Sequence, residues 1–120
     1  MKDLIVASIL FVLIDSLYLS SMTKYFTKQI FDIQKSALVL DMQATVLCYM
    51  FLILGLYYFI LKDKKSVFDA FVFGLVLYMV FETTNKALFT KWNWMTVLYD
   101  GVWGGILYAS TTYLTYQLTK

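Results

Sequence analysis

Four long, mostly apolar stretches take up most of this 120-residue sequence. They cover about residues 4–22, 37–61, 67–85 and 95–118. A helix of about 20 apolar residues is long enough to cross the hydrocarbon core of a bilayer. Because a chain in lipid must satisfy its own backbone hydrogen bonds, each stretch is predicted to be a transmembrane helix. The connections are short, so the predicted fold class is all-α. We expect one integral-membrane domain, residues 1–120, that forms a four-helix bundle.

The composition excludes several classes of protein. The sequence is 61% hydrophobic and 15% charged, whereas soluble domains carry about 25% charged residues. The net charge is only +2, and no basic patch alternates with aromatic residues, so nucleic acid is not expected as a partner. Histidine is absent and Cys48 is the single cysteine. We therefore expect no metal site, no cofactor and no disulfide, and the lipid bilayer is the expected partner.

Two of the connections look interfacial. The first, residues 23–36, mixes Tyr25 and Phe26 with Lys24 and Lys28, which predicts an amphipathic helical segment in the headgroup region. The third connection contains tryptophans. Membrane proteins concentrate tryptophan and tyrosine at the two interfaces. The residues predicted to lie at the interface are Tyr25, Trp92 and Trp94.

Four spans place both termini on the same side of the membrane. Lysines are shared evenly between the two sides, with Lys2, Lys62, Lys64, Lys65 and Lys120 on one side and Lys24, Lys28, Lys35, Lys86 and Lys91 on the other. The positive-inside rule therefore barely discriminates. The compact K-D-K-K run at residues 62–65 and the basic amino terminus favour cytoplasmic termini.

Acidic residues from all four helices fall in one half of the predicted bundle. They are Asp15, Asp41, Glu82 and Asp100. An aspartate at the centre of a membrane helix costs about 2.5–3.5 kcal/mol and normally faces the interior or water. Asp41 stands at a helix start and is predicted to be an N-cap. Glu82 is expected to pair with Lys86, four residues on. If Asp15 and Asp100 face each other, they are expected to share a proton.

These acids define a candidate buried polar cluster whose other members are potential hydrogen-bond partners. The cluster comprises Asp15, Tyr18, Glu82, Thr84, Asn85, Asp100 and Trp103. Intramembrane acidic residues are functional by default. However, a buried polar network can also hold helices in register and do nothing else.

The fourth stretch carries a pattern of small residues. Gly101, Gly105 and Ala109 recur every fourth residue, and Gly104 lies beside them. Such a stripe lets another helix approach closely. We expect it to serve helix packing, and a homo-oligomer through Gly101 and Gly105 is one possible use.

Three motifs resemble those of a bacterial family of predicted four-span membrane proteins, family 2177 among the domains of unknown function. They are L-I-D-S-L-Y-L at residues 13–19, F-E-T-T-N-K at 81–86 and T-V-L-Y-D-G-V-W-G at 96–104. The resemblance covers nearly the whole chain and implies a four-helix membrane fold, but it implies no agreed activity. According to this resemblance, the recurring polar positions of the family correspond to Asp15, Tyr18, Tyr25, Glu82, Thr84, Asn85, Trp92, Asp100, Trp103 and Gly104.

Two departures from the family pattern stand out. Glu82 replaces the usual aspartate, and Asn93 replaces the proline that follows the tryptophan. The resemblance implies a bacterial inner membrane. The composition, which has lysine but no arginine and is rich in tyrosine and phenylalanine, also suggests a viral protein in a host membrane.

Three functions stay open from the sequence. The first is proton- or cation-linked transport through a cavity lined by the acidic cluster. The second is a membrane enzyme or binding protein for a lipid, in which a carboxylate pair serves as general acid and base. The third is a structural or assembly protein that uses the glycine stripe and the aromatic belt. Whether the protein is an enzyme is left undecided.

Overall fold

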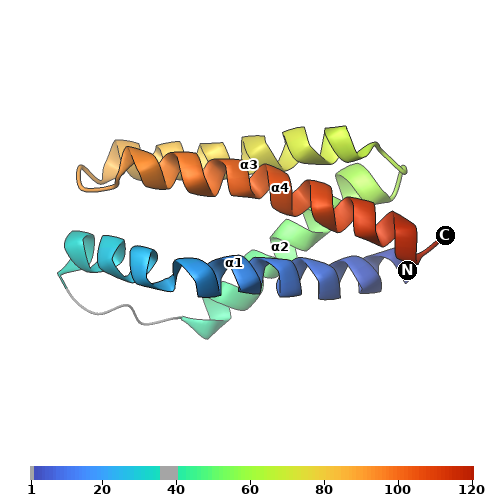
Figure 1. The fold of residues 1–120 in the computed structure, drawn as a ribbon, viewed down its shortest axis with the longest axis horizontal. Helices are drawn as coiled ribbons and strands as arrows, with labels where there is room; N and C mark the ends of the chain where they lie inside the picture. Colours follow the sequence, from blue (N-terminus) through green and yellow to red (C-terminus); the bar gives the residue numbers. More distant parts are fainter. Residues whose placement is uncertain (1, 36–40) are drawn as a thin grey trace.

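The computed structural model describes residues 2–35 and 41–120. These residues form four α-helices and no strand: α1 (Lys2–Gln34), α2 (Met42–Leu56), α3 (Val67–Leu88) and α4 (Trp94–Leu118). A turn of π-helix, η1 (Tyr57–Leu61), continues α2. The predicted all-α membrane bundle is confirmed (Figure 1). The predicted first residues of the second span, 37–40, lie outside the described residues.

Side-chain caps mark where three of the helices begin. Asp41 caps α2 as predicted, because its Oδ1 accepts a hydrogen bond from the backbone N–H of Ala44 at 3.1 Å. Ser66 Oγ accepts from the Asp69 N–H at 3.0 Å at the start of α3. Asn93 Oδ1 accepts from the Met95 N–H at 2.9 Å at the start of α4. Each cap satisfies a backbone donor that has no partner inside its helix.

Helix α1 is much longer than a single crossing requires. The amphipathic segment is helical, as predicted, and continues α1 without a break to Gln34. The helix stops at Lys35, whose φ of 60° lies in the left-handed region. At about 1.5 Å per residue, a 33-residue helix is about 50 Å long, whereas the hydrocarbon core is about 30 Å thick. Part of α1 therefore extends beyond the hydrocarbon or lies steeply tilted in it.

The helices differ in how closely they pack. Helices α3 and α4 run antiparallel side by side, and α1 lies along the other side of α4 (Figure 1). The α3–α4 contact is the most extensive, the α1–α4 contact is second, and α1 barely touches α2. Helix α2 crosses the bundle obliquely (Figure 1). Both termini lie at the same end of the bundle.

Glycines let α3 and α4 meet at backbone distance. A Cβ at Gly74 of α3 would run into the carbonyl oxygen of Gly104, and a Cβ at Gly104 would run into the Tyr78 ring. Gly101 and Gly105 are likewise covered by side chains of α3. The small-residue stripe thus serves helix packing, as expected. Its partner is α3 of the same chain, which leaves no surface there for a second copy, so the expected oligomer contact is withdrawn.

The bundle has one half that is packed solid. Next to the termini, the core side chains Phe11, Leu61 and Tyr108 are completely buried. We call this the closed half, and the half that holds Asp15, Glu82 and Asp100 the open half. On the outside, large apolar side chains such as Leu17 and Phe68 are exposed on every helix. This is the surface that a lipid environment requires.

By length and composition, three of the described helical segments could cross a membrane: Lys2–Gln34, Met42–Leu61 and Val67–Leu88. Helix α4 is more polar because it is the central helix of the bundle. Ten of its residues are buried, and most of them are glycines and threonines that face its neighbours: Thr96, Val97, Gly101, Gly104, Gly105, Leu107, Tyr108, Thr111, Thr112 and Thr115.

Candidate functional site

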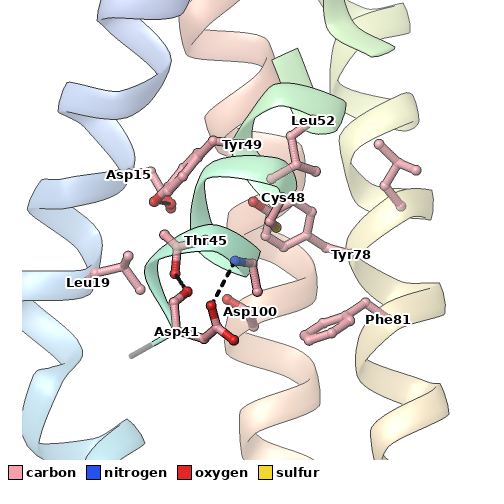
Figure 2. Close-up of a pocket in the computed structure, with 12 residues that line it drawn as sticks. Asp15, Leu19, Asp41, Thr45, Cys48, Tyr49, Leu52, Tyr78, Phe81 and Asp100 are labelled. Carbon is pink, nitrogen blue, oxygen red and sulfur yellow. Dashed lines mark hydrogen bonds between the residues drawn. The ribbon is translucent and has the colours of Figure 1, made fainter. Parts of the chain in front are cut away.

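A cavity of about 500 Å³ lies in the open half, between α2 and the other three helices (Figure 2). It exists because α2 is attached to the bundle at its far end. Of the residues in α2 and η1, only Leu56, Ile60 and Leu61 are buried. Asp15 from α1, Asp41 from the start of α2 and Asp100 from α4 all contribute to its wall. The remaining lining is largely aliphatic and aromatic.

Asp15 is the best-fixed carboxylate of the site. Its side chain is buried, and both of its oxygens accept a hydrogen bond. The Tyr49 hydroxyl donates to Oδ2 at 2.5 Å, and the Trp103 indole N–H donates to Oδ1 at 2.9 Å. Asp15 therefore ties α1 to α2 and α4 at one point.

Tyr18 links Asp15 to the second acidic group. Its ring stacks on the Trp103 indole, with ring centroids 4.4 Å apart and planes within 5°. Its buried hydroxyl interacts with Asp100, although no well-formed hydrogen bond pairs it in the described part of the chain. Trp103, which bonds to Asp15, and Tyr18, which interacts with Asp100, thus connect the surroundings of the two aspartates.

Glu82 and Asp100 form the carboxyl pair of the open half. Glu82 is 1% exposed, and its carboxyl group lies close enough to that of Asp100 for the two to interact electrostatically. Two adjacent carboxyl groups avoid mutual repulsion when they share one proton. The Trp92 indole N–H donates to Glu82 Oε1 at 2.8 Å. The sequence paired Glu82 with Lys86 instead, but Lys86 Nζ donates to the carbonyl oxygen of Thr90 at 3.3 Å.

The structure brings together most of the predicted cluster, but two members lie apart. Thr84 is exposed, and its hydroxyl donates to the carbonyl oxygen of Val80 in its own helix at 2.6 Å. The prediction that Thr84 is buried was wrong, since it faces away from α4. Asn85 is half-buried, and among the described residues no hydrogen bond joins its side chain to the three carboxyl groups of the open half.

Of the three aromatic residues predicted to lie at the interface, one is exposed and two join the interior of the bundle. Trp94 is exposed, and Lys86 Nζ lies 5.7 Å from the centroid of its ring. Trp92 instead turns inward to Glu82, as described above. The Tyr25 hydroxyl lies 2.7 Å from Thr96 Oγ1, so Tyr25 also joins the interior network.

A second polar network, which the sequence did not predict, lies at the outer end of the open half. Gln29 is buried, and its Nε2 donates to the carbonyl oxygen of Lys91 at 2.8 Å. Its Oε1 accepts from the Asn93 N–H at 3.1 Å and from Thr96 Oγ1 at 2.8 Å. Gln29 thereby fixes the end of α1 to the α3–α4 connection.

Two residues of the site, Gln29 and Tyr49, were not predicted. The sequence contained a usable signal for the first and none for the second. Gln29 continues, at spacings of three and four residues, the inward face of α1 that passes through Asp15, Tyr18 and Tyr25. That periodicity was a usable signal. Tyr49 lies in a helix that is apolar all round, so nothing in its spacing pointed toward Asp15.

Within residues 2–35 and 41–120, no three His, Cys, Asp or Glu side chains are grouped so that they could hold a metal ion. The chemistry that the site offers is therefore that of carboxyl groups: they bind protons, accept hydrogen bonds and attract cations.

The family described as "Predicted membrane protein (DUF2177)" matches residues 1–117. The resemblance seen in the three motifs is thereby confirmed, and the match extends over Asp15, Glu82 and Asp100 alike. No curated protein and no solved structure matches the chain. The family description places its members in a membrane and gives no activity.

Proposed function

The chain belongs to this family of predicted membrane proteins, and from that premise we propose that it binds protons or small cations inside the bilayer. In this proposal all four helices cross the membrane, and the open half exchanges its proton or cation with one membrane surface. The protein thus performs at least one half-step of proton- or cation-linked transport.

The observation that supports the proposal is a set of carboxyl groups inside the bundle that have no basic partner among the described residues. Asp15, Glu82 and Asp100 come from three different helices and lie in the same half of the bundle. In the described part of the chain, the single ion pair joins Lys64 to Asp3 near the termini. A charge in the membrane interior needs compensation. A bound proton or cation supplies that compensation here.

The carboxyl groups have different roles in the proposal. Asp15 is held in a fixed position by two hydrogen-bond donors. Asp100 lines the cavity and contacts Glu82 behind it, so the pair can take up and release one proton. Trp92 holds Glu82 in place from the α3–α4 connection. Asp100 is therefore the group that exchanges with the cavity.

Access in this conformation is limited to the open half. Phe11, Leu61 and Tyr108 are completely buried in the hydrophobic core of the closed half. Release to the opposite surface would require α2 to move, and α2 is the helix least attached to the bundle. The π-helical turn η1 lies where such a movement would begin.

Flux measurements in liposomes test this function. With a pH-sensitive dye inside and an imposed proton, sodium or potassium gradient, Asp100→Asn is expected to lower the protein-dependent flux by about tenfold or more. Asp69→Asn is the matched control, because Asp69 is an exposed aspartate at the start of α3. Thermal denaturation verifies that both variants are folded. Flux that equals that of empty liposomes, or that is the same in Asp100→Asn and wild type, would contradict the proposal.

A further inference from the structure

The cavity is much larger than a proton or a small cation needs. Its volume is about 500 Å³, which falls within the range of about 300–1,000 Å³ typical of small-molecule pockets. Water occupies about 30 Å³ per molecule, and an apolar cavity does not hold water well. The lining includes Leu19, Leu52, Leu77 and Phe81. A volume of this size with such walls suits a hydrocarbon chain.

Several side chains that line the cavity are also exposed on the outer surface of the bundle. Leu19 of α1, Cys48 of α2 and Phe81 of α3 all line it and are all exposed at its rim. The first half of α2 makes few contacts with its neighbours and stands over the cavity (Figure 2). A ligand can therefore enter from the bilayer between helices, and it need not cross the aqueous end of the bundle.

The polar part of the wall is acidic. Asp15, Asp41 and Asp100 contribute carboxyl groups, and none of the described residues that line the cavity is a lysine. An anionic lipid head group would be repelled by these side chains. A primary ammonium group offers a positive charge and three hydrogen-bond donors, which matches acceptors that have no basic partner. The wall thus combines apolar surface with a site for a cationic head group.

We infer that the cavity binds a single-chain amphiphile with a cationic amine head group, which enters from the bilayer and places its amine among the carboxyl groups. This inference rests on the proposed function insofar as the same carboxyl groups receive the positive charge. It adds the class of ligand, a lipid-soluble amine, and the route, a lateral one. The hydrocarbon chain lies along Leu52, Leu77 and Phe81.

Cys48 provides the means to test it, because it is the only cysteine of the chain and lines the cavity. Purified protein in nanodiscs is labelled with a maleimide in the presence of dodecylamine. We expect dodecylamine to slow the labelling of Cys48 several-fold, whereas dodecanol, with the same chain and no charge, should not. Butylamine, with the charge and almost no chain, should not protect either.

Two variants make the test specific. In a Cys48→Ser/Met50→Cys variant the thiol lies on the same helix, at an exposed position outside the cavity lining, and dodecylamine should not protect it. Asp15→Asn/Asp100→Asn should lose protection at Cys48. If that double variant does not fold, Ala44→Trp, which fills the cavity from an exposed position on α2, should abolish protection instead.

The outcomes separate this inference from the proposed function. Equal protection by dodecanol, by butylamine or at Met50→Cys overturns the amphiphile and leaves the flux result untouched. Flux that depends on Asp100 without any protection by dodecylamine also overturns the inference alone. Protection at Cys48 in a protein whose flux equals that of empty liposomes overturns the proposed transport alone.

Discussion

Helices α3 and α4 meet at backbone distance along their lengths, whereas α2 meets the rest of the bundle mainly through its last turns. The first contact buries Gly74 of α3 together with Gly101, Gly104 and Gly105 of α4. Helix α2 has a single glycine, Gly55, and its packing is ordinary: an added Cβ would lie 3.5 Å from Phe73 Cζ.

The difference shows how this chain builds both a scaffold and a cavity from apolar sequence. In lipid, apolar surface gives no driving force for helix association, so contact depends on close packing and on hydrogen bonds between helices. Small residues supply the close packing between α3 and α4. Helix α2, whose single glycine makes only an ordinary contact, is joined to α1 by the hydrogen bond from Tyr49 to Asp15 and to α4 by one from the Tyr108 hydroxyl to the carbonyl oxygen of Leu52. The space that remains beneath α2 is the cavity.

The largest expected effect comes from adding one methyl group to the close contact. Gly74→Ala should lower the free energy of unfolding by about 1–3 kcal/mol, because the new Cβ meets the backbone of α4, which cannot move aside. Gly55→Ala is the matched control. It should be neutral or stabilising by up to about 1 kcal/mol, since alanine favours a helix over glycine. Denaturation in detergent, followed by tryptophan fluorescence, measures both. Equal stability of the two variants would refute backbone contact at Gly74.

The next effect concerns the polar attachment of α2. Asp15→Ala should cost about 1–3 kcal/mol, because it leaves the Tyr49 hydroxyl and the Trp103 indole N–H without their acceptor. Tyr49→Phe alone should cost about 0.6 kcal/mol, the average for a hydrogen bond between membrane helices. In the Asp15→Ala background, Tyr49→Phe should cost nothing further. An undiminished cost there would show that Tyr49 stabilises the fold by some other contact.

The smallest effect is expected from a buried hydroxyl of α4 that has no hydrogen-bond partner. Thr112 is completely buried, and within the described residues its Oγ1 is unpaired. Thr112→Val should therefore change stability by less than about 0.5 kcal/mol or increase it. Thr96→Val serves as the comparison, because Thr96 is equally buried and bonds to Gln29 and Tyr25. It should cost about 1 kcal/mol. The same denaturation assay compares them, and equal effects would contradict the network at Gln29.

Much of the fold was predictable because membrane helices can be recognised in a sequence by their length and apolar composition. The predicted boundaries of the third and fourth spans lie within a few residues of α3 and α4. Asp41 was recognisable as a cap since a short acidic side chain preceded an apolar run. The continuation of α1 to Gln34 was less visible, because its polar last turns resemble a connection.

The sequence predicted most of the residues of the site, but not which side chains contact one another. Asp15, Tyr18, Glu82, Asp100 and Trp103 do gather in one half of the bundle, since topology alone fixes the depth of each residue. Which carboxyl groups meet depends on how each helix is rotated about its axis. Asp100 therefore meets Glu82, while Asp15 bonds to Tyr49 and Trp103. Spacing along the chain carries no information on that rotation between helices.

The pairing of α1 with α4 has a consequence for how the protein is made. Helix α1 leaves the ribosome first, yet its main partner is translated last. Until Trp103 emerges, Asp15 stands in the nascent chain without its indole donor. A chain truncated before Trp94 therefore keeps the Tyr49 donor to Asp15 but lacks the Trp103 donor. One oxygen of this carboxylate is then left without its partner, a feature by which quality-control proteases are expected to select the product for removal.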